Sequence, residues 1–362
     1  MSTIHFAIPR LRSALLLGLA TVAPAALSAQ AEINARDAEI RFGGRLHSQF
    51  ATSTADGGKA TDFFTRRARF TIDVRVTPLL DARVQPDFGG GKLDLKDAYF
   101  RLNFDRAFRL SMGQFKRAFD IFELNSSTDI VVVERTGRID GLRGCGGLDG
   151  PCTLSRFTEK LGYSDRDIGL KVDGSLAGRV GYMVTLTNGT GTSGSDENSG
   201  KSFAGRLSLG LTDRVTLAGN LSRHDYGDLR DRGNTRAATA FGVDLEFGGF
   251  RDGTHLQLGL IRGENWRLRR TASGPPRFLT WQGILSRYVA LEGTRLEAVE
   301  PMARVSWGDP DGNTDADSAL LITPGLFLYV KGKNRIGVNL DVYDSGADSR
   351  EYSLKLQTYL YY

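Results

Sequence analysis

Nine cationic side chains in the first third of the chain recur at positions that could gather on one surface. Seven are arginines set in alternating apolar and polar runs: Arg45, Arg67, Arg69, Arg75, Arg83, Arg101 and Arg109. Lys116 and Arg117 follow them. Arginine stays protonated and offers a planar fork of donors that suits phosphate and carboxylate groups. Because rings of Arg or Lys give pores their anion selectivity, the pattern predicts an anion path lined by these nine side chains.

Carboxylates on the same face leave a second interpretation open. They are Asp73, Asp81, Asp87 and Asp97. Cross-strand pairs between these groups and the arginines would neutralise the surface. The charged face would then solvate a wall and select solutes only weakly.

Apolar and polar residues alternate along most of the chain, which is typical of β-strands with two different faces. In residues 67–76, for example, Ala68 and Phe70 fall on one face and Arg67 and Arg69 on the other. Five such runs lie near residues 40–50, 67–76, 81–88, 97–104 and 108–113. Eleven more lie near 165–174, 178–188, 201–212, 213–223, 236–248, 252–262, 277–291, 295–307, 318–330, 333–343 and 351–362. The sequence predicts sixteen strands.

The connections between these strands differ in length in a regular way. Short links such as 77–80 and 212–213 alternate with long polar links such as 188–200 and 263–276. Short turns at one end and long loops at the other are typical of bacterial outer-membrane barrels, in which only the lipid-facing half of each strand must be apolar. This fits a chain that is only 40% hydrophobic. We predict an all-β, sixteen-stranded antiparallel transmembrane barrel over residues 32–362.

Residues 1–31 have the pattern of a secretory signal peptide. Arg10 and Arg12 precede an apolar stretch, and Ala29-Gln30-Ala31 offers a cleavage site. Removal of the two arginines lowers the formal charge from +5 to +3, so any preference for anions must come from where charges sit. A signal peptide followed by a transmembrane barrel predicts export to the bacterial outer membrane and insertion into its lipid bilayer.

One long segment, residues 118–164, interrupts the alternation. Loops longer than about 12–15 residues are uncommon and are generally functional or disordered, so we expect this segment to fold into the lumen as a constriction loop. Glu134 and Arg135 within it could pair with each other or anchor the loop to the wall. Cys145 and Cys152 are close enough to form a disulfide in an exported protein, either stiffening the constriction or clipping a surface loop.

An ordered set of motifs resembles the phosphate-selective porin O/P family. The set runs from Gly113-Gln114-Phe115-Lys116 through Phe119, Ser126-Ser127, Glu134-Arg135 and 323–329 to the Tyr-rich C-terminal strand. The resemblance implies a third extracellular loop that folds into the barrel, passage of phosphate or other small anions, and a homotrimer. The terminal aromatic residue, Tyr362, also resembles the signal read by the outer-membrane assembly machinery.

Other functions compete with anion transport. A general porin would have the same strands without selectivity, and an adhesin would have no conducting lumen. An outer-membrane enzyme would need a histidine near Ser or Asp at one rim, for which His224-Asp225 is the candidate. No pattern indicates a metal, a cofactor or nucleic acid. We therefore expect a passive porin for small, anionic solutes such as phosphate, and no catalytic residues.

Overall fold

The computed structural model describes residues 32–35 (backbone only), 38–57, 61–142, 144–192, 196, 199–226, 236–268, 274–293, 295–346 and 350–362. The predicted signal peptide, residues 1–31, lies outside the described residues.

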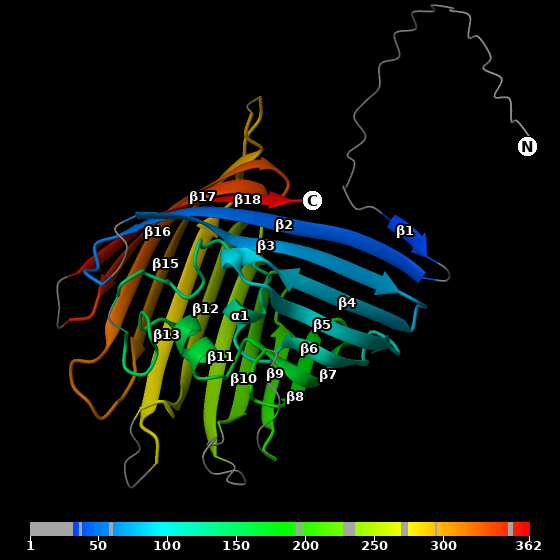
Figure 1. The fold of residues 1–362 in the computed structure, drawn as a ribbon, viewed down its shortest axis with the longest axis horizontal. Coiled ribbons are helices and arrows are strands. Elements are labelled where there is room, and N and C mark those ends of the chain that lie inside the picture. The colour runs from blue at the N-terminus through cyan, green and yellow to red at the C-terminus, as the bar shows by residue number, and fades with distance from the viewer. Residues whose placement is uncertain are drawn as a thin grey trace, which may run out of the picture.

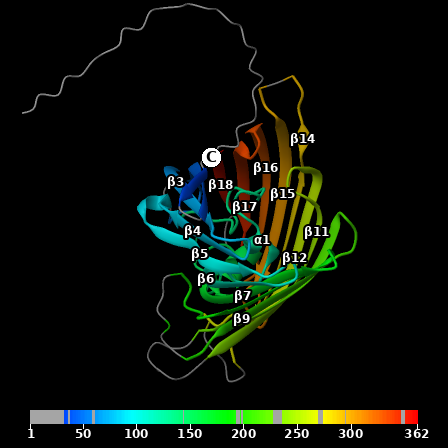
Figure 2. The ribbon, with the colours of Figure 1, turned by 90° about the vertical axis from the view of Figure 1, so that its right-hand side faces the viewer.

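Sixteen long strands form one antiparallel sheet that closes on itself (Figures 1 and 2). They are β2 (Ala38–Ser53), β3 (Thr61–Arg75), β4 (Leu80–Asp87), β5 (Asp94–Asn103), β6 (Arg109–Lys116), β7 (Arg166–Leu176), β8 (Val180–Thr187), β9 (Ser202–Gly210), β10 (Val215–Asp225), β11 (Ala237–Gly249), β12 (Asp252–Glu264), β13 (Arg277–Arg287), β15 (Ala298–Asp309), β16 (Ala319–Lys331), β17 (Asn334–Asp344) and β18 (Glu351–Tyr361). The last strand, β18, pairs with β2 from Ser353↔Ser53 to Tyr361↔Arg45, which completes the ring. The predicted sixteen-stranded barrel is confirmed.

Two short strands complete the sheet. β1 (Glu32–Ala35) pairs with the start of β2. β14 (Val289–Ala290) continues β13 along β15, so the single strand predicted at 277–291 is interrupted at Tyr288.

The alternation of the sequence separates two faces of the sheet. On β3, the arginine Arg69 is 8% exposed and points inward, whereas its neighbour Phe70 is 51% exposed on the outside. The same division runs around the ring, where exposed apolar residues such as Met112, Leu207 and Leu285 form an outer band. An apolar exterior around a polar interior is the pattern of a transmembrane barrel.

The segment between β6 and β7, residues 117–165, lies inside the ring of strands, where its first helix is visible in both views (Figures 1 and 2). We call it the inner loop. It contains α1 (Ile121–Leu124) and α2 (Leu154–Lys160), while a 3₁₀ turn, Gly89–Gly91, joins β4 to β5. Its apolar side chains, among them Phe119, Val133 and Leu148, are fully buried. No helix in the described part of the chain is long and apolar enough to cross a membrane.

Small residues on the wall make room for the inner loop. Phe157 of α2 stacks on Phe278 of β13 with ring centroids 4.8 Å apart. A Cβ at Gly308 of β15 would overlap the Phe157 ring, so glycine is needed where the loop meets the wall. The apolar core of the protein therefore lies between the inner loop and the strands, inside the barrel.

Candidate functional site

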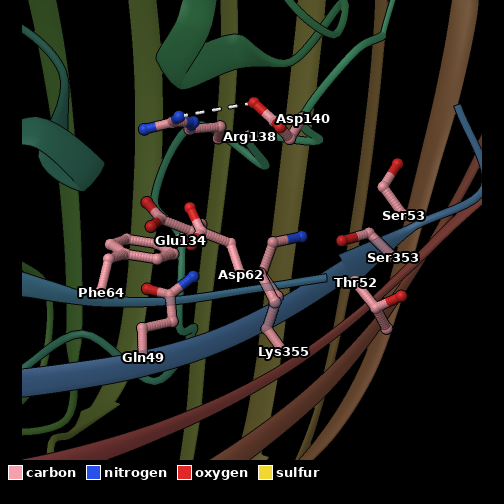
Figure 3. A pocket seen from close by; sticks show the side chains of 11 residues that line it. Gln49, Thr52, Ser53, Asp62, Phe64, Glu134, Arg138, Asp140, Ser353 and Lys355 are labelled. Atoms are coloured by element: carbon pink, nitrogen blue, oxygen red, sulfur yellow. Dashed lines mark ion pairs between the residues drawn. The ribbon is translucent and has the colours of Figure 1, made fainter. Parts of the chain in front are cut away.

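Three cavities follow one another along the inward faces of β2 and β3. The outer cavity, of about 30 Å³, is lined by Gln49 and Phe64 (Figure 3). The middle cavity, of about 200 Å³, is lined by Arg45 and Arg69. The inner cavity, of about 280 Å³, lies nearest the short turns.

The middle cavity is strongly cationic. Its charged lining consists of Arg45, Arg67, Arg69, Arg83, Lys116, Arg135, Arg166 and the single carboxylate Asp97. Strands β2 to β7 supply all of these except Arg135, which comes from the inner loop together with Leu124, Ser126 and Ser127. The cavity thus lies between a basic wall and the inner loop.

Five carboxylates at or beside this cavity neutralise part of the charge. Arg69 Nε lies 2.6 Å from Asp87, and Arg166 lies 2.7 Å from Asp97 and 3.7 Å from Asp165. Arg83 binds Asp73 through two nitrogens, at 2.7 and 3.0 Å. Glu123 of α1 serves both Arg135, at 2.8 Å, and Lys116, at 3.4 Å. Seven cations against five carboxylates leave an excess of positive charge.

Arg45 and Arg67 carry that excess. Among the described residues neither has a carboxylate within ion-pair distance, although both side chains are buried. Arg45 Nη1 donates to Ser127 Oγ at 2.6 Å. Arg67 Nη1 lies 3.4 Å from His47 Nδ1, and its Nε has no hydrogen-bond partner among the described residues. Buried charge without a counter-charge is costly, so an anion in the cavity would stabilise both side chains.

In the inner cavity, by contrast, the arginines are paired with carboxylates. Its arginines Arg41, Arg75, Arg83 and Arg101 face the carboxylates Glu39, Asp73 and Asp81. Arg101 lies 2.9 Å from Asp81, and Arg75 lies 3.7 Å from Glu39. Each cation there has a carboxylate partner, although Arg41 and Arg75 share Glu39, so four arginines against three carboxylates leave only a small positive excess.

Glu134 and Arg135 lie on opposite sides of the inner loop. Glu134 lines the outer cavity and binds Arg66 of β3 at 2.6 and 3.0 Å. Burial alone would raise the pKa of Glu134, but the Arg66 guanidinium holds it at about 2. Arg135 lines the middle cavity and donates to Asn125 O at 2.7 Å. The pair does not bond internally; Glu134 anchors the loop to the wall.

Across the lumen from the cavities, the inward side chains of β15 and β17, which we call the far wall, form hydrogen bonds with the backbone of the inner loop. Arg304 of β15 donates to the carbonyls of Glu134 and Arg135 at 2.8 and 3.0 Å and lies 3.0 Å from Asp341 of β17. Arg335, also on β17, donates to Thr128 O at 3.0 Å and Ile130 O at 2.9 Å. Asn339 accepts from Val133 N at 2.7 Å.

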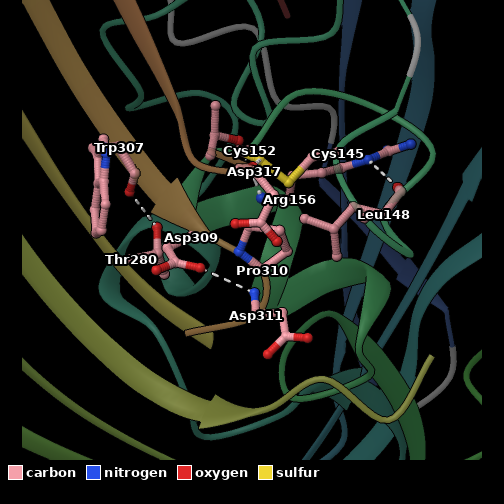
Figure 4. The surroundings of a disulfide bond; sticks show 12 residues. Cys145, Leu148, Cys152, Arg156, Thr280, Trp307, Asp309, Pro310, Asp311 and Asp317 are labelled. Carbon is pink, nitrogen blue, oxygen red and sulfur yellow. Dashed lines mark hydrogen bonds between the residues drawn. A yellow bond between two sulfur atoms is a disulfide. The ribbon is translucent and has the colours of Figure 1, made fainter. Parts of the chain in front are cut away.

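Cys145 and Cys152 form a disulfide within the inner loop (Figure 4). The bond lies beside the connection between β15 and β16, near Pro310 and Asp317. Cys152 N donates to Tyr343 OH of β17 at 3.3 Å. The disulfide is therefore on the far wall, away from the middle cavity.

The predicted cationic residues lie in different places, and Arg83 lines two of the cavities. The middle cavity holds Arg45, Arg67, Arg69, Arg83 and Lys116, and the inner cavity holds Arg75, Arg83 and Arg101. Arg109 lines neither and pairs with Asp173 of β7.

Arg117 corrects the predicted path. Its guanidinium turns to β9 and β10, where it lies 3.3 Å from both His224 Nδ1 and Ser222 Oγ. The chain leaves the sheet after Lys116, so the strand alternation that placed the earlier arginines no longer applies.

Two arginines of the site were missed by the sequence pattern. Arg66 points inward beside Arg67 because the pairing of β2 and β3 shifts between His47 and Ser48, which is a β-bulge. Two adjacent arginines that break an alternating run were the available signal. Arg166 begins β7 directly after the loop, where no alternating pattern precedes it.

Other chemistry finds little support among the described residues. No group of three or more His, Cys, Asp or Glu side chains there is placed to hold a metal ion. His224 is 5% exposed, and its Nδ1 lies 3.3 Å from both Arg117 and Ser202 Oγ. Its Nδ1 thus contacts a guanidinium and a hydroxyl, whereas the corresponding nitrogen in a Ser-His-Asp triad contacts a carboxylate.

Comparison with known proteins agrees with the barrel. Residues 40–216 match the family of phosphate-selective porins O and P. Among functionally curated proteins, no sequence matches the chain. The outer membrane channel DcaP of Acinetobacter baumannii superposes with a TM-score of 0.62 at 12% identity, covering 92% of this chain and 100% of that one.

Two further barrels are similar. Salmonella typhi OmpF, solved with daunomycin, has a TM-score of 0.59 at 13% identity, over 91% of this chain and all of that one. An anion-selective porin from Comamonas acidovorans has a TM-score of 0.59 at 10% identity, over 90% of this chain and all of that one. With the family match and the closed barrel together, the chain is a bacterial outer-membrane porin whose residues 40–216 match the phosphate-selective porins O and P.

Proposed function

We propose that this porin passes small anions by diffusion and that the middle cavity selects them. Arg45 and Arg67 carry the proposal, because they are buried beside water-sized space with no carboxylate partner among the described residues. An oxyanion entering the cavity would supply the missing counter-charge and accept the free guanidinium hydrogen bonds. Phosphate fits this description, as do other small oxyanions.

The inner loop acts as the constriction in this proposal. It closes one side of the middle cavity with Leu124, Ser126, Ser127 and Arg135. Its hydrogen bonds to the far wall hold it across the lumen, so solutes pass between the loop and the basic wall. The disulfide stiffens the part of the loop that lies against β17.

The charge of the lining changes from one cavity to the next along the path. Carboxylates Asp62, Glu134 and Asp140 line the outer cavity with Lys355 and Arg138. The middle cavity is cationic, and the inner cavity is nearly balanced. Selection is therefore confined to one short part of the path.

A general porin without charge selectivity is the alternative, and it would require a different arrangement of the arginines. If the arginines of the middle cavity were as fully paired as those of the inner cavity, the walls would be neutral and solutes would be sorted by size. The similarity in fold to an anion-selective porin from Comamonas acidovorans favours the selective form. An enzyme or an adhesin draws no support from the arrangement of the described side chains.

Assembly is also part of the proposal. We infer a homotrimer, export through a cleaved leader at residues 1–31, and insertion by the outer-membrane assembly machinery. Support for the last comes from the C-terminal end of the chain, where Leu356 and Leu360 of β18 and the terminal Tyr362 are exposed on the outer face.

Reversal potentials in a planar bilayer test the proposed function. Under a potassium chloride gradient, the protein should give a potential of the sign set by chloride. Added phosphate should then reduce the chloride current by occupying the same cavity. A potential near zero would favour the general porin, and a cation-selective potential would contradict the proposal.

A further inference from the structure

Three arginines on the outside of the barrel lie where an apolar surface gives way to the long loops. Arg223 on β10, Arg262 on β12 and Arg277 on β13 are all exposed and point away from the lumen. The connections after β10 and β12 belong to the long set. In outer-membrane barrels, long loops mark the extracellular side.

The strand registers bring these arginines together. Arg223 pairs with Thr239, Glu264 with Arg277, and Arg262 with Leu279. Arg223 and Arg277 thus lie in one row across β10 to β13, three strand spacings or roughly 14 Å apart. Arg262 lies one outward position nearer the centre of the strands, as a diagonal neighbour of Arg277.

A groove of about 470 Å³ lies between them on the outer surface. It is lined by Thr239, Phe241, Arg262, Gly263, Glu264 and Arg277. Glu264 is the carboxylate in this group, and it accepts a hydrogen bond from Thr239 N at 2.8 Å. Among the described residues, none of the three arginines has a carboxylate within ion-pair distance, so the groove retains positive charge.

Apolar residues continue from the groove toward the middle of the barrel. Phe241 is 61% exposed, and Leu260, Leu279 and Trp281 are exposed beside it. A ligand for this surface must therefore combine anionic groups at the rim with hydrocarbon along the wall. A phosphorylated membrane lipid has this combination, whereas a free phosphate ion has only half of it.

The strands that follow the groove around the rim differ. Asp309, which pairs with Leu279 across β13 and β15, and Asp344 on β17 place carboxylates at outward positions near the strand ends. Asp344 is paired with Arg350 at 2.8 Å. The basic groove is therefore a local feature of β10 to β13, not a property of the whole rim.

We propose that this groove, which we call the rim groove, binds the phosphorylated headgroup of an outer-leaflet lipid, with its acyl chains along Phe241, Leu260 and Leu279. Arg262 and Arg277 hold one phosphate, and Arg223 reaches a second group across Thr239. The site lies outside the lumen and is independent of the selectivity of the pore.

Native mass spectrometry of the full-length protein in detergent tests this proposal, with bisphosphorylated lipid A as the probe. The triple variant R223Q/R262Q/R277Q should bind it at least about tenfold more weakly than the wild type. The matched control R106Q/R179Q/R214Q removes three exposed arginines from the short-turn end and should bind as the wild type does. Reversal potentials of the triple variant should be unchanged, which separates this result from the proposed function.

Three outcomes would overturn the proposal. They are wild-type affinity in the triple variant, an equal loss of affinity in the control, and undiminished binding of fully dephosphorylated lipid A. Displacement of the lipid by inorganic phosphate at the same concentration would also contradict it, because the groove would then recognise the ion and not the lipid.

Discussion

The two sides of the lumen bury arginines in different ways. We call the inward faces of β2–β5 the basic wall and those of β15–β17 the anchoring wall. On the anchoring wall, Arg304 bonds Asp341, Thr323 and two loop carbonyls. On the basic wall, Arg67 contacts His47, and its Nε has no hydrogen-bond partner in the part of the chain that the structure describes.

This difference distinguishes arginines that hold the protein together from arginines that can bind a solute. Arg335 of the anchoring wall lies over the Tyr359 ring, 4.4 Å from its centroid, and donates to loop carbonyls. Both of its terminal nitrogens donate within the protein and its charge lies over aromatic rings, although its Nε, like that of Arg67, has no hydrogen-bond partner among the described residues. Arg45 and Arg67 keep unused binding capacity beside a cavity, so the surroundings of an arginine, more than its presence, indicate which wall conducts.

Arg304→Gln should produce the largest loss of stability and so tests the anchoring wall. It would leave Asp341 buried with less counter-charge and would free two loop carbonyls, and breaking a buried ion pair costs about 3–5 kcal/mol. Denaturant unfolding in detergent would measure the loss. Arg350→Gln is the control, because that arginine is exposed at the rim, and it should leave the unfolding curve unchanged. An equal curve for Arg304→Gln would mean that the loop does not depend on this wall.

Asp120→Asn should stabilise the inner loop in a pH-dependent way. Burial raises the pKa of the Asp120 carboxyl from its ordinary value of 3.8 to about 7. The folded protein therefore binds a proton that the unfolded chain releases, and stability falls as the pH rises between these values. Since each unit of pKa corresponds to about 1.4 kcal/mol, the gain for Asn above pH 7 has an upper bound of about 4 kcal/mol.

Unfolding of the Asp120→Asn variant at acid and neutral pH measures this effect. Wild type and variant should have equal stability near pH 4 and separate as the pH rises. The amide oxygen can accept from Phe122 N as the carboxyl does, and the amide NH2 can donate to Thr158 Oγ1, whose hydroxyl can donate to Ser155 O. A difference in stability that stays constant at all pH values would contradict the link between folding and proton binding by Asp120.

Removal of the disulfide should have a smaller effect, confined to the anchoring side. The bond closes a loop with a sequence separation of 7. Closure of so short a loop is expected to contribute about 2–3 kcal/mol. The C145S/C152S variant should unfold more easily but keep the reversal potential of the wild type, because the cysteines lie away from the middle cavity. A changed reversal potential would show that the two walls are coupled.

The sequence predicted the barrel well because one simple constraint repeats in every strand. Lipid outside and water inside impose a period of two, which Phe70 and Arg69 obey like the other strand residues. The lengths of the links between strands can also be read directly from the sequence. The strand count and both faces therefore follow from local patterns.

The site was less predictable because it depends on contacts between distant segments. Alternation places Arg45 and Arg75 on the same face but says nothing about their partners. Glu39 pairs with Arg75, and Ser127 of the loop meets Arg45. The bulge at Arg66 and the turn of Arg117 toward β10 are irregularities of the backbone that no period reveals.

The reversal potential of R45Q/R67Q, beside that of R75Q/R101Q, tests the central claim most directly. Both variants remove two inward arginines, but only the first pair lacks carboxylate partners in the described structure. We predict that R45Q/R67Q loses most of the chloride selectivity, while R75Q/R101Q keeps it or loses little. Equal losses in the two variants, or unchanged selectivity in R45Q/R67Q, would contradict a selective site at the middle cavity.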